Sequence, residues 1–117
     1  MRGVDVVRAG HLSHGGITPG IFREKAFETS GALLSKSTVS AGTVSSWHHH
    51  AARDLFGFVV SGTLRLEFKE AEPVDITQGD FFHVSPGLVH RDVNPGKASV
   101  EIVNILLGEG PAVVNVD

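Results

Sequence analysis

The chain alternates short apolar runs with turn residues along most of its 117 residues, and this pattern decides which folds are open to it. The segment Thr63–Phe68 shows it most clearly, because Leu64, Leu66 and Phe68 fall on one face of a strand and polar residues fall on the other. Gly, Pro, Asn or Asp closes such runs about every ten residues. Almost nothing has the apolar spacing of a helix. The pattern predicts an all-β sandwich or barrel instead of a parallel α/β sheet.

The expected strands follow one another with short turns between them. We predict them at residues 21–28, 32–41, 43–50, 55–60, 63–68, 74–76, 81–84, 88–93, 100–107 and 112–116. The run at 100–107 is the most apolar and is expected to be the central strand. Residues 1–20 are expected to form an irregular arm with one short strand at most. One domain is expected over residues 1–117, with its barrel at about 30–110.

The composition excludes several partners and one kind of metal site. Ten basic side chains against thirteen acidic ones give a net charge of −3, so no basic stripe is available to bind nucleic acid. The chain has no cysteine, which excludes disulfides and thiolate ligands. No apolar run is long enough to span a bilayer, and the first ten residues do not resemble a signal peptide. We therefore expect a cytoplasmic protein without a membrane partner.

Three consecutive histidines are the strongest chemical signal in the sequence. On a strand, His48 and His50 share one face and His49 points to the other. Two imidazoles with this spacing can converge on one ion, and a third ligand has to come from another strand. His90, just after the turn at Pro86-Gly87, is the best candidate. The sequence thus predicts one divalent metal ion bound by His48, His50 and His90.

These residues lie within two motifs that resemble those of the cupin superfamily. The first motif, G-x5-H-x-H-x3,4-E-x6-G, is matched by Gly42, His48 and His50. The second, G-x5-P-x-G-x2-H-x3-N, is matched at Gly79, Gly87, His90 and Asn94, although Ser85 stands at its proline position and Pro86 follows. Two motifs in the correct order make a specific signal.

The resemblance to a small single-domain cupin implies a fold and an assembly. It implies a double-stranded β-helix, which is a jelly-roll barrel with the metal inside. It also implies paired barrels, so we expect a homodimer in which the N-terminal arm crosses to the partner.

The glutamate of the first motif is missing. Counting back from Gly62 along what looks like a regular strand places Leu55 at its position, and counting forward from His50 gives Asp54. The two counts put opposite faces of the strand inward. We favour Leu55, which leaves three histidines and no carboxylate. A bulge that turns Asp54 inward would make it a fourth ligand.

The leading functional hypothesis is a metal-dependent enzyme, dioxygenase-like, that acts on a small organic molecule. With Leu55 inward, Gly57 also faces inward, and we expect it to leave space beside the metal. Three-histidine cupin sites resemble those of thiol and diketone-cleaving dioxygenases, in which iron is usual. Imidazole ligands suit Fe, Mn, Zn, Ni or Cu, so the metal stays open.

Two alternatives remain open at this point. One is a non-catalytic module that binds or senses a small molecule in its barrel. The other is an isomerase-type cupin, which needs a general base, for which His83 and Asp54 are the candidates nearby. Phe56 and Phe58 are expected to fill the layer between two sheets.

Overall fold

The computed structural model describes residues 3–117. In this part of the chain, the regular structure consists of strands: β1 (Ser13–His14), β2 (Ile21–Glu28), β3 (Ala32–Val39), β4 (His48–His49), β5 (Asp54–Ser61), β6 (Thr63–Glu67), β7 (Val74–Thr77), β8 (Phe81–Val84), β9 (Arg91–Val93), β10 (Val100–Leu107) and β11 (Val114–Asn115). The predicted all-β class is confirmed. Over the same residues, no helix is suited to crossing a membrane.

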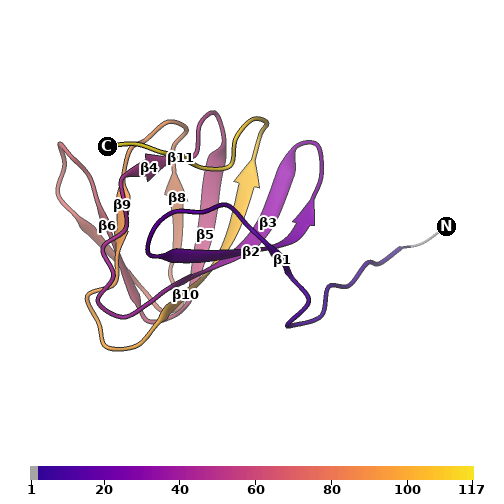
Figure 1. Ribbon diagram of the computed structural model, residues 1–117, viewed down its shortest axis with the longest axis horizontal. Helices are drawn as coiled ribbons and strands as arrows, with labels where there is room; N and C mark the ends of the chain where they lie inside the picture. Colours follow the sequence, from indigo (N-terminus) through magenta and orange to yellow (C-terminus); the bar gives the residue numbers. More distant parts are fainter. Residues whose placement is uncertain (1–2) are drawn as a thin grey trace.

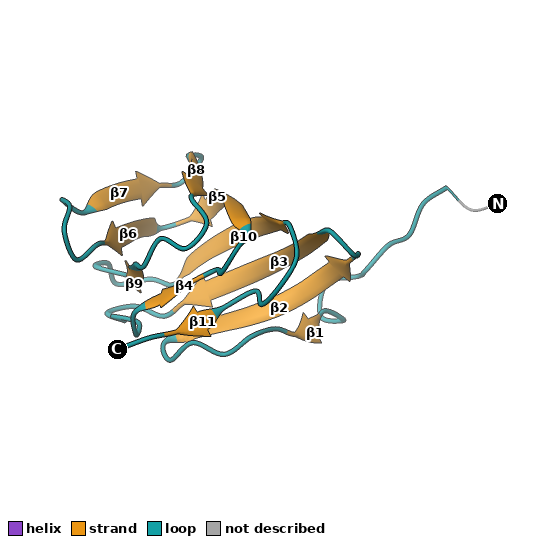
Figure 2. Cartoon of the chain, turned by 90° about the horizontal axis from the view of Figure 1, so that it is seen from above, coloured by secondary structure: helices purple, strands orange, loops and turns teal. Residues whose placement is uncertain are grey.

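The strands form one large sheet and two smaller ones. The large sheet has the order β1-β2-β3-β10-β5-β8, and β10 lies between β3 and β5, so its predicted central place is confirmed. The smaller sheets have the orders β7-β6-β9 and β11-β4. Figure 2 shows β2, β3 and β10 side by side, with β6, β7 and β9 at the end of the molecule away from the N-terminus.

Isolated bridges join the smaller sheets into a second layer. Val44 pairs with Val93, and His48 pairs with His90, so the chain around β4 runs antiparallel to the chain around β9. The core lies between this layer and the large sheet. Its most buried apolar side chains come from both layers: Val39, Val59, Leu64, Val100 and Ile102. The strand alternation predicted for Leu64 and Leu66 is therefore observed.

The N-terminal segment is irregular, as predicted. Between residues 3 and 20, β1 is the only strand, and Figure 1 shows the segment before it extending away from the sheets. Residues 1 and 2 of the predicted arm lie outside the described residues. The predicted crossing of this arm to a partner, and the homodimer itself, stay predictions.

Five predicted strands are shorter in the structure, two of them by only one or two residues at β3 and β6. The strand expected at 43–50 is reduced to β4, with one further bridge at Val44. A positive φ of 54° at Ala51 turns the chain directly after His50, because extended backbone cannot continue through that conformation. The strands expected at 88–93 and 112–116 are limited to β9 and β11.

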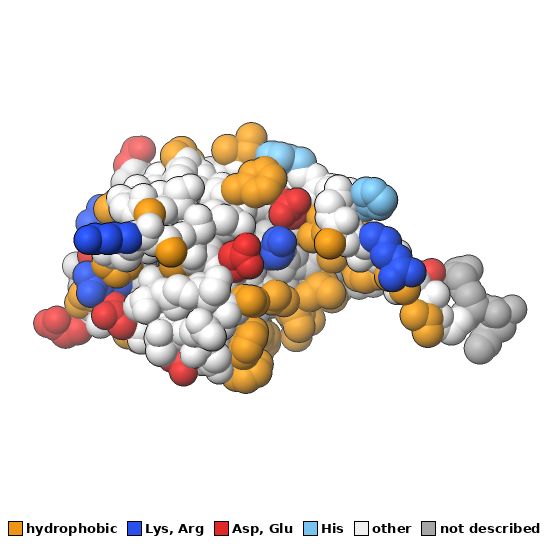
Figure 3. All heavy atoms as spheres, turned by 90° about the horizontal axis from the view of Figure 1, so that it is seen from below, with side chains coloured by type: hydrophobic (Ala, Val, Ile, Leu, Met, Phe, Trp, Pro, Cys, Tyr) orange, Lys and Arg blue, Asp and Glu red, His pale blue; other side chains and the backbone are white. Residues whose placement is uncertain are grey.

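The prediction for Phe56 and Phe58 is wrong. Both lie on the outer face of β5, because Leu55 and Val59 take the inward positions of the same strand. The Phe56 ring stacks on His83 of β8 at a centroid distance of 4.7 Å, and Phe58 contacts Phe81 at 4.7 Å. Phe81 is itself 80% exposed. Figure 3 shows further hydrophobic side chains at the surface.

Candidate metal centre

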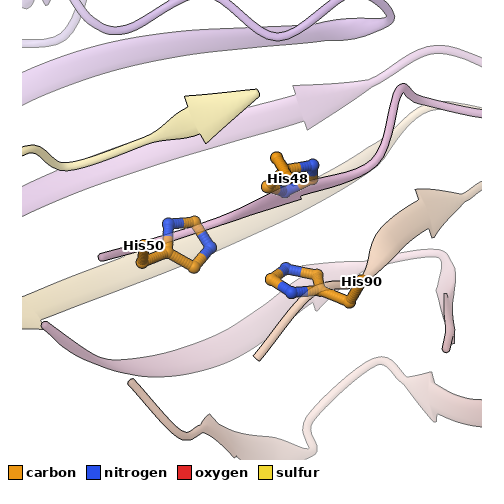
Figure 4. Close-up of side chains that lie close together, drawn as sticks. All are labelled: His48, His50 and His90. Carbon is orange, nitrogen blue, oxygen red and sulfur yellow. The ribbon is translucent and has the colours of Figure 1, made fainter. Parts of the chain in front are cut away.

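His48, His50 and His90 converge inside the barrel. β4 provides His48, His50 follows two residues later on the same side, and His90 immediately precedes β9. The backbones of His48 and His90 exchange two hydrogen bonds of 2.9 Å, which fixes the two segments side by side. The three ring centroids lie 4.5–5.4 Å apart, and Figure 4 shows the rings gathered in one place. One ligand atom from each residue lies within 4.8 Å of the others. We call these residues the histidine cluster.

Backbone hydrogen bonds fix the tautomer of each ring in the histidine cluster. Nδ1 of His48 donates to the carbonyl of Ser46 at 3.0 Å. Nδ1 of His50 donates to the carbonyl of Ala112 at 2.8 Å, and Nδ1 of His90 donates to that of Leu88 at 2.8 Å. A carbonyl can only accept, so each Nδ1 carries the proton. All three Nε2 atoms keep the lone pair that a metal requires.

Burial keeps His48 and His50 neutral. His48 is 1% exposed and His50 is 4% exposed. Burial lowers the pKa of His48 to about 3, and the nearby charge of His90 lowers it further. Burial likewise lowers the pKa of His50 to about 3, against the hydrogen bond to Ala112, which favours the charged form. Neutral imidazoles are the form in which histidine binds a metal.

The histidine cluster opens into a cavity of about 40 Å³ between the two layers. A volume of this size has room for roughly three water molecules. Leu55, Leu106 and Phe82 form apolar walls. The polar wall carries a hydrogen bond of 2.8 Å from the Asn104 amide to the Ser37 hydroxyl. The enclosed space therefore suits a ligand group of a few heavy atoms.

Leu55 occupies the position of the missing motif glutamate. It is 6% exposed and lines the cavity, as the favoured count predicted. Asp54 points to the outer face of β5, where its carboxylate accepts a hydrogen bond of 2.7 Å from His83 Nε2. The bulge that would turn Asp54 inward is not formed, because Leu55 pairs with Leu106 in regular register. The alternative in which Asp54 is a fourth ligand is therefore wrong.

The prediction that Gly57 leaves space beside the metal is also wrong. Gly57 faces inward, but a Cβ atom placed on it would lie 2.3 Å from Cζ of Phe82. Phe82 is opposite Gly57 in the pairing of β5 with β8, and its ring fills the place that a side chain would take. Gly57 therefore accommodates a neighbouring aromatic ring, and it does not provide room for a ligand.

Arg23 is a cavity residue that the sequence reasoning missed. It lies on β2, which covers the cavity, and its guanidinium donates to the Thr18 hydroxyl. Among the described residues, no carboxylate lies within 4.0 Å of it. Its positive charge lowers the pKa of both His48 and His50, which places it close to the histidine cluster. Arg23 is available to pair with an anionic group in the cavity.

Asp92 is the second missed residue. It lies on β9, is 8% exposed and lines the cavity. Its Oδ1 lies 3.6 Å from His48 Nε2 and 3.9 Å from His90 Nε2. Within the described part of the chain, this buried oxygen has no hydrogen-bond partner. Burial raises the pKa of Asp92, and the charges of His90 and Arg23 oppose that increase.

These observations fit a divalent metal ion. Three neutral imidazoles with free Nε2 atoms are a common donor set for Zn, Fe, Mn, Ni or Cu, and they leave further coordination positions open. The three backbone carbonyls that accept from Nδ1 hold the rings in place, as groups around protein metal sites commonly do. The unpartnered oxygen of Asp92 is a buried acceptor that a cation would satisfy.

One of the two missed residues had a signal in the sequence. Asp92 follows His90 by two residues, the same spacing as His48 and His50, so strand alternation places it on the side of the ligand. Arg23 had no comparable signal. Its position over the cavity depends on the way β2 pairs with β3, and local sequence does not show this.

The comparisons with known proteins agree with this architecture. The sequence profile of the family described as "Cupin domain" matches residues 35–106, which is more than half of the chain. No curated protein sequence matches. The polyketide cyclase RemF from Streptomyces resistomycificus has a similar structure, with a TM-score of 0.80 and 15% identity, and the match covers 97% of this chain and 86% of that one.

Two further solved structures share the fold. One is a conserved protein with a double-stranded β-helix domain from Klebsiella pneumoniae, with a TM-score of 0.74, 18% identity, and coverage of 85% of this chain and 86% of that one. The other is a predicted oxalate decarboxylase from Thermotoga maritima, with a TM-score of 0.74, 16% identity, and coverage of 89% and 99%. At these identities the likeness shows the fold, and the predicted double-stranded β-helix is confirmed.

Proposed function

Because the chain belongs to the cupin domain family, we propose that it is a metal-dependent enzyme, dioxygenase-like, that acts on a small organic acid at the histidine cluster. The observation that carries the proposal is the convergence of three buried Nε2 atoms on a cavity that Arg23 also lines, and within residues 3–117 no carboxylate lies within 4.0 Å of its guanidinium. A bound redox-active ion such as iron would supply the open positions at which an organic substrate and dioxygen react.

The residues of this chain divide the remaining work. The three histidines hold the ion through Nε2, because their Nδ1 protons are given to backbone carbonyls. Arg23 pairs with the carboxylate of the substrate, since a planar guanidinium binds that group through two parallel hydrogen bonds. Leu55 and Phe82 exclude water from the other side of the cavity.

Two observations support a small anion as the substrate. The cavity of about 40 Å³ limits the enclosed part of the substrate to a few heavy atoms. Lys25 also lines the cavity, but its ammonium is paired with Glu28 at 3.3 Å, so Arg23 supplies the positive charge that faces the cavity. An anion is therefore favoured over a neutral molecule of the same size.

The isomerase-type alternative loses the two bases that the sequence offered. His83 and Asp54 bind each other on the outer face of the large sheet, and both side chains are 43% exposed. Neither lines the cavity. The non-catalytic binding module remains the second candidate, because the same cavity and the same Arg23 would also serve a sensor.

Oxygen uptake tests the enzyme proposal. Protein purified without nickel resin is analysed for its metals, loaded anaerobically with Fe²⁺, and assayed with small carboxylic acids, thiols, diketones and phenols. We expect uptake with a carboxylate-bearing member of the panel. The absence of uptake across the whole panel would refute the oxygenase, and a carboxylate that raises the melting temperature without turnover would favour the binding module.

A matched pair of arginine variants tests the substrate class. Arg23→Met should raise KM for the carboxylate at least tenfold, because one charge-assisted pair is lost. Arg65→Met is the control, since Arg65 is bound to Asp75 at 2.7 Å on the other layer. Equal KM values for the two variants would contradict the role of Arg23.

A further inference from the structure

We propose that Asp92 is a fourth ligand of the metal and replaces, from a different strand, the carboxylate that Leu55 removed from the first motif. This inference rests on the proposed metal site at the histidine cluster. It assigns a coordination role to a residue of β9, whereas the lost glutamate position lies on β5. The structure provides three separate observations for it: strand alternation, interatomic distances and an unpartnered buried oxygen.

Strand alternation directs Asp92 toward the ion. His90 and Asp92 are two residues apart on an extended segment, so their side chains leave the backbone on the same side. The backbone of this segment is firmly held. Asp92 N donates to the Ser45 hydroxyl at 2.9 Å, and the Asp92 carbonyl accepts from Ser45 N at 2.9 Å. The carboxylate therefore remains directed into the cavity.

The distances from Asp92 to two of the three rings are short enough for atoms that share an ion. The group of ligand atoms within 4.8 Å of one another holds the three histidines and not Asp92, so the carboxylate and the His50 ring would have to move closer together on binding. Two ligands that are each about 2.1 Å from one metal can be at most about 4.2 Å apart. Asp92 Oδ1 lies 3.6 Å from His48 Nε2 and 3.9 Å from His90 Nε2, within that limit for both rings. Both distances are longer than a hydrogen bond, so neither ring nitrogen satisfies this oxygen.

The oxygen also lacks any other partner. Asp92 Oδ1 is buried and accepts no hydrogen bond from residues 3–117, and burying a carboxylate in that state costs free energy. The positive charge of Arg23 acts on Asp92, but among the described residues the Arg23 guanidinium forms no ion pair within 4.0 Å. A cation held between Asp92 and the histidine cluster would satisfy this oxygen. The site then has three imidazoles and one carboxylate, although Leu55 is apolar.

Two variants with the same chemical change separate this role from a general effect of charge. Metal-free full-length wild type, Asp92→Asn and Asp54→Asn are titrated with Co²⁺ against a competing chelator. We expect Asp92→Asn to raise Kd about 10- to 100-fold and to shift the visible cobalt bands. Asp54→Asn should leave both unchanged, because Asp54 is bound to His83 on the outer face.

A cysteine variant gives a positive signal at the same position. The chain has no cysteine, so Asp92→Cys introduces its only thiol. A thiolate that binds cobalt produces a strong sulfur-to-metal charge-transfer band in the near ultraviolet. We expect this band for Asp92→Cys and not for Asp54→Cys. This measurement keeps the proposal testable if Asp92→Asn is poorly folded.

The outcomes separate this inference from the proposed metal site. If wild type binds Co²⁺, His48→Ala abolishes binding, and the Asp92 variants show wild-type affinity without a charge-transfer band, the role of Asp92 is overturned and the metal site stands. If wild type binds no Co²⁺, both fail. Thermal unfolding adds a further check, since Asp92→Asn should stabilise the metal-free protein or leave it unchanged, and should reduce the stabilisation by Co²⁺. A purely structural role would instead destabilise the metal-free protein.

Discussion

Acid should unfold the metal-free protein through His48 and His50. In the unfolded chain each histidine has its ordinary pKa of 6.5, and in the folded chain burial lowers the pKa of both to about 3. Between these values the unfolded state binds more protons, so the free energy of unfolding must fall as the pH falls below 6.5. The stabilisation is complete above this value and is lost progressively toward pH 3.

The pKa values set the size of the effect. Relative to its value well above pH 6.5, the free energy of unfolding falls by about 1.4 kcal/mol per histidine at pH 5.5 and by about 2.7 kcal/mol per histidine at pH 4.5. Together the two remove about 5 kcal/mol at pH 4.5, which is comparable to the whole stability of many small domains. In the intervening range, two protons give a slope of about 2.7 kcal/mol per pH unit.

Urea denaturation of chelator-treated protein between pH 4.5 and 7 measures this slope. His50→Asn should reduce it to about half, because one of the two protons is removed. Ile76→Val is the control, since it removes a buried methylene group on β7 and should lower stability at every pH without changing the slope. Asp92 has a raised pKa, which acts with the opposite sign, but it is present in all three proteins. An equal slope for wild type and His50→Asn would refute the reasoning.

Substitutions at two positions of β5 test the packing around the cavity. Gly57→Ala should destabilise the protein by about 1–3 kcal/mol, because its Cβ would lie 2.3 Å from the Phe82 ring, and Phe82→Leu should recover part of the loss; urea midpoints of the single and double variants check this. Leu55→Glu should restore a carboxylate beside the histidine cluster, lowering the stability of the metal-free protein by about 2–4 kcal/mol and increasing its affinity for Co²⁺. Leu55→Gln should destabilise without the gain in affinity, and chelator competition distinguishes the two.

The fold and the histidine cluster were predictable because they depend on local patterns. Period-two alternation identifies strands, and it places His48 and His50 on one side and His49 on the other. The convergence of His90 on the pair was predicted as well, although it requires two segments that are distant in sequence. The spacing of two motifs provided the long-range information that strand periodicity lacks.

Predictions failed where the identity of the facing element decided the outcome. Alternation correctly assigned Gly57 to the inner face, but it could not show that Phe82 lies across from it. It also assigned Phe56 and Phe58 correctly to the other face, and the error was to assume that a second sheet covers that face. Arg23 escaped notice for the same reason, since its approach to the histidine cluster follows from the pairing of β2 with β3.

Leu55 shows why the inward–outward alternation of neighbouring residues is a more reliable guide than counting residues from a distant glycine. The count from Gly62 assumed a regular strand, but the pairing of β5 with β10 shifts register between Glu101 and Ile102, which are opposite Ser61 and Val59. The irregularity lies at the end of β5 near Gly62, and the alternation from Leu55 to Val59 is unbroken. Because the alternation is unbroken, Leu55 must point inward and its neighbour Asp54 must point outward. A carboxylate for the metal can therefore come only from another strand, and β9 presents Asp92 at that point.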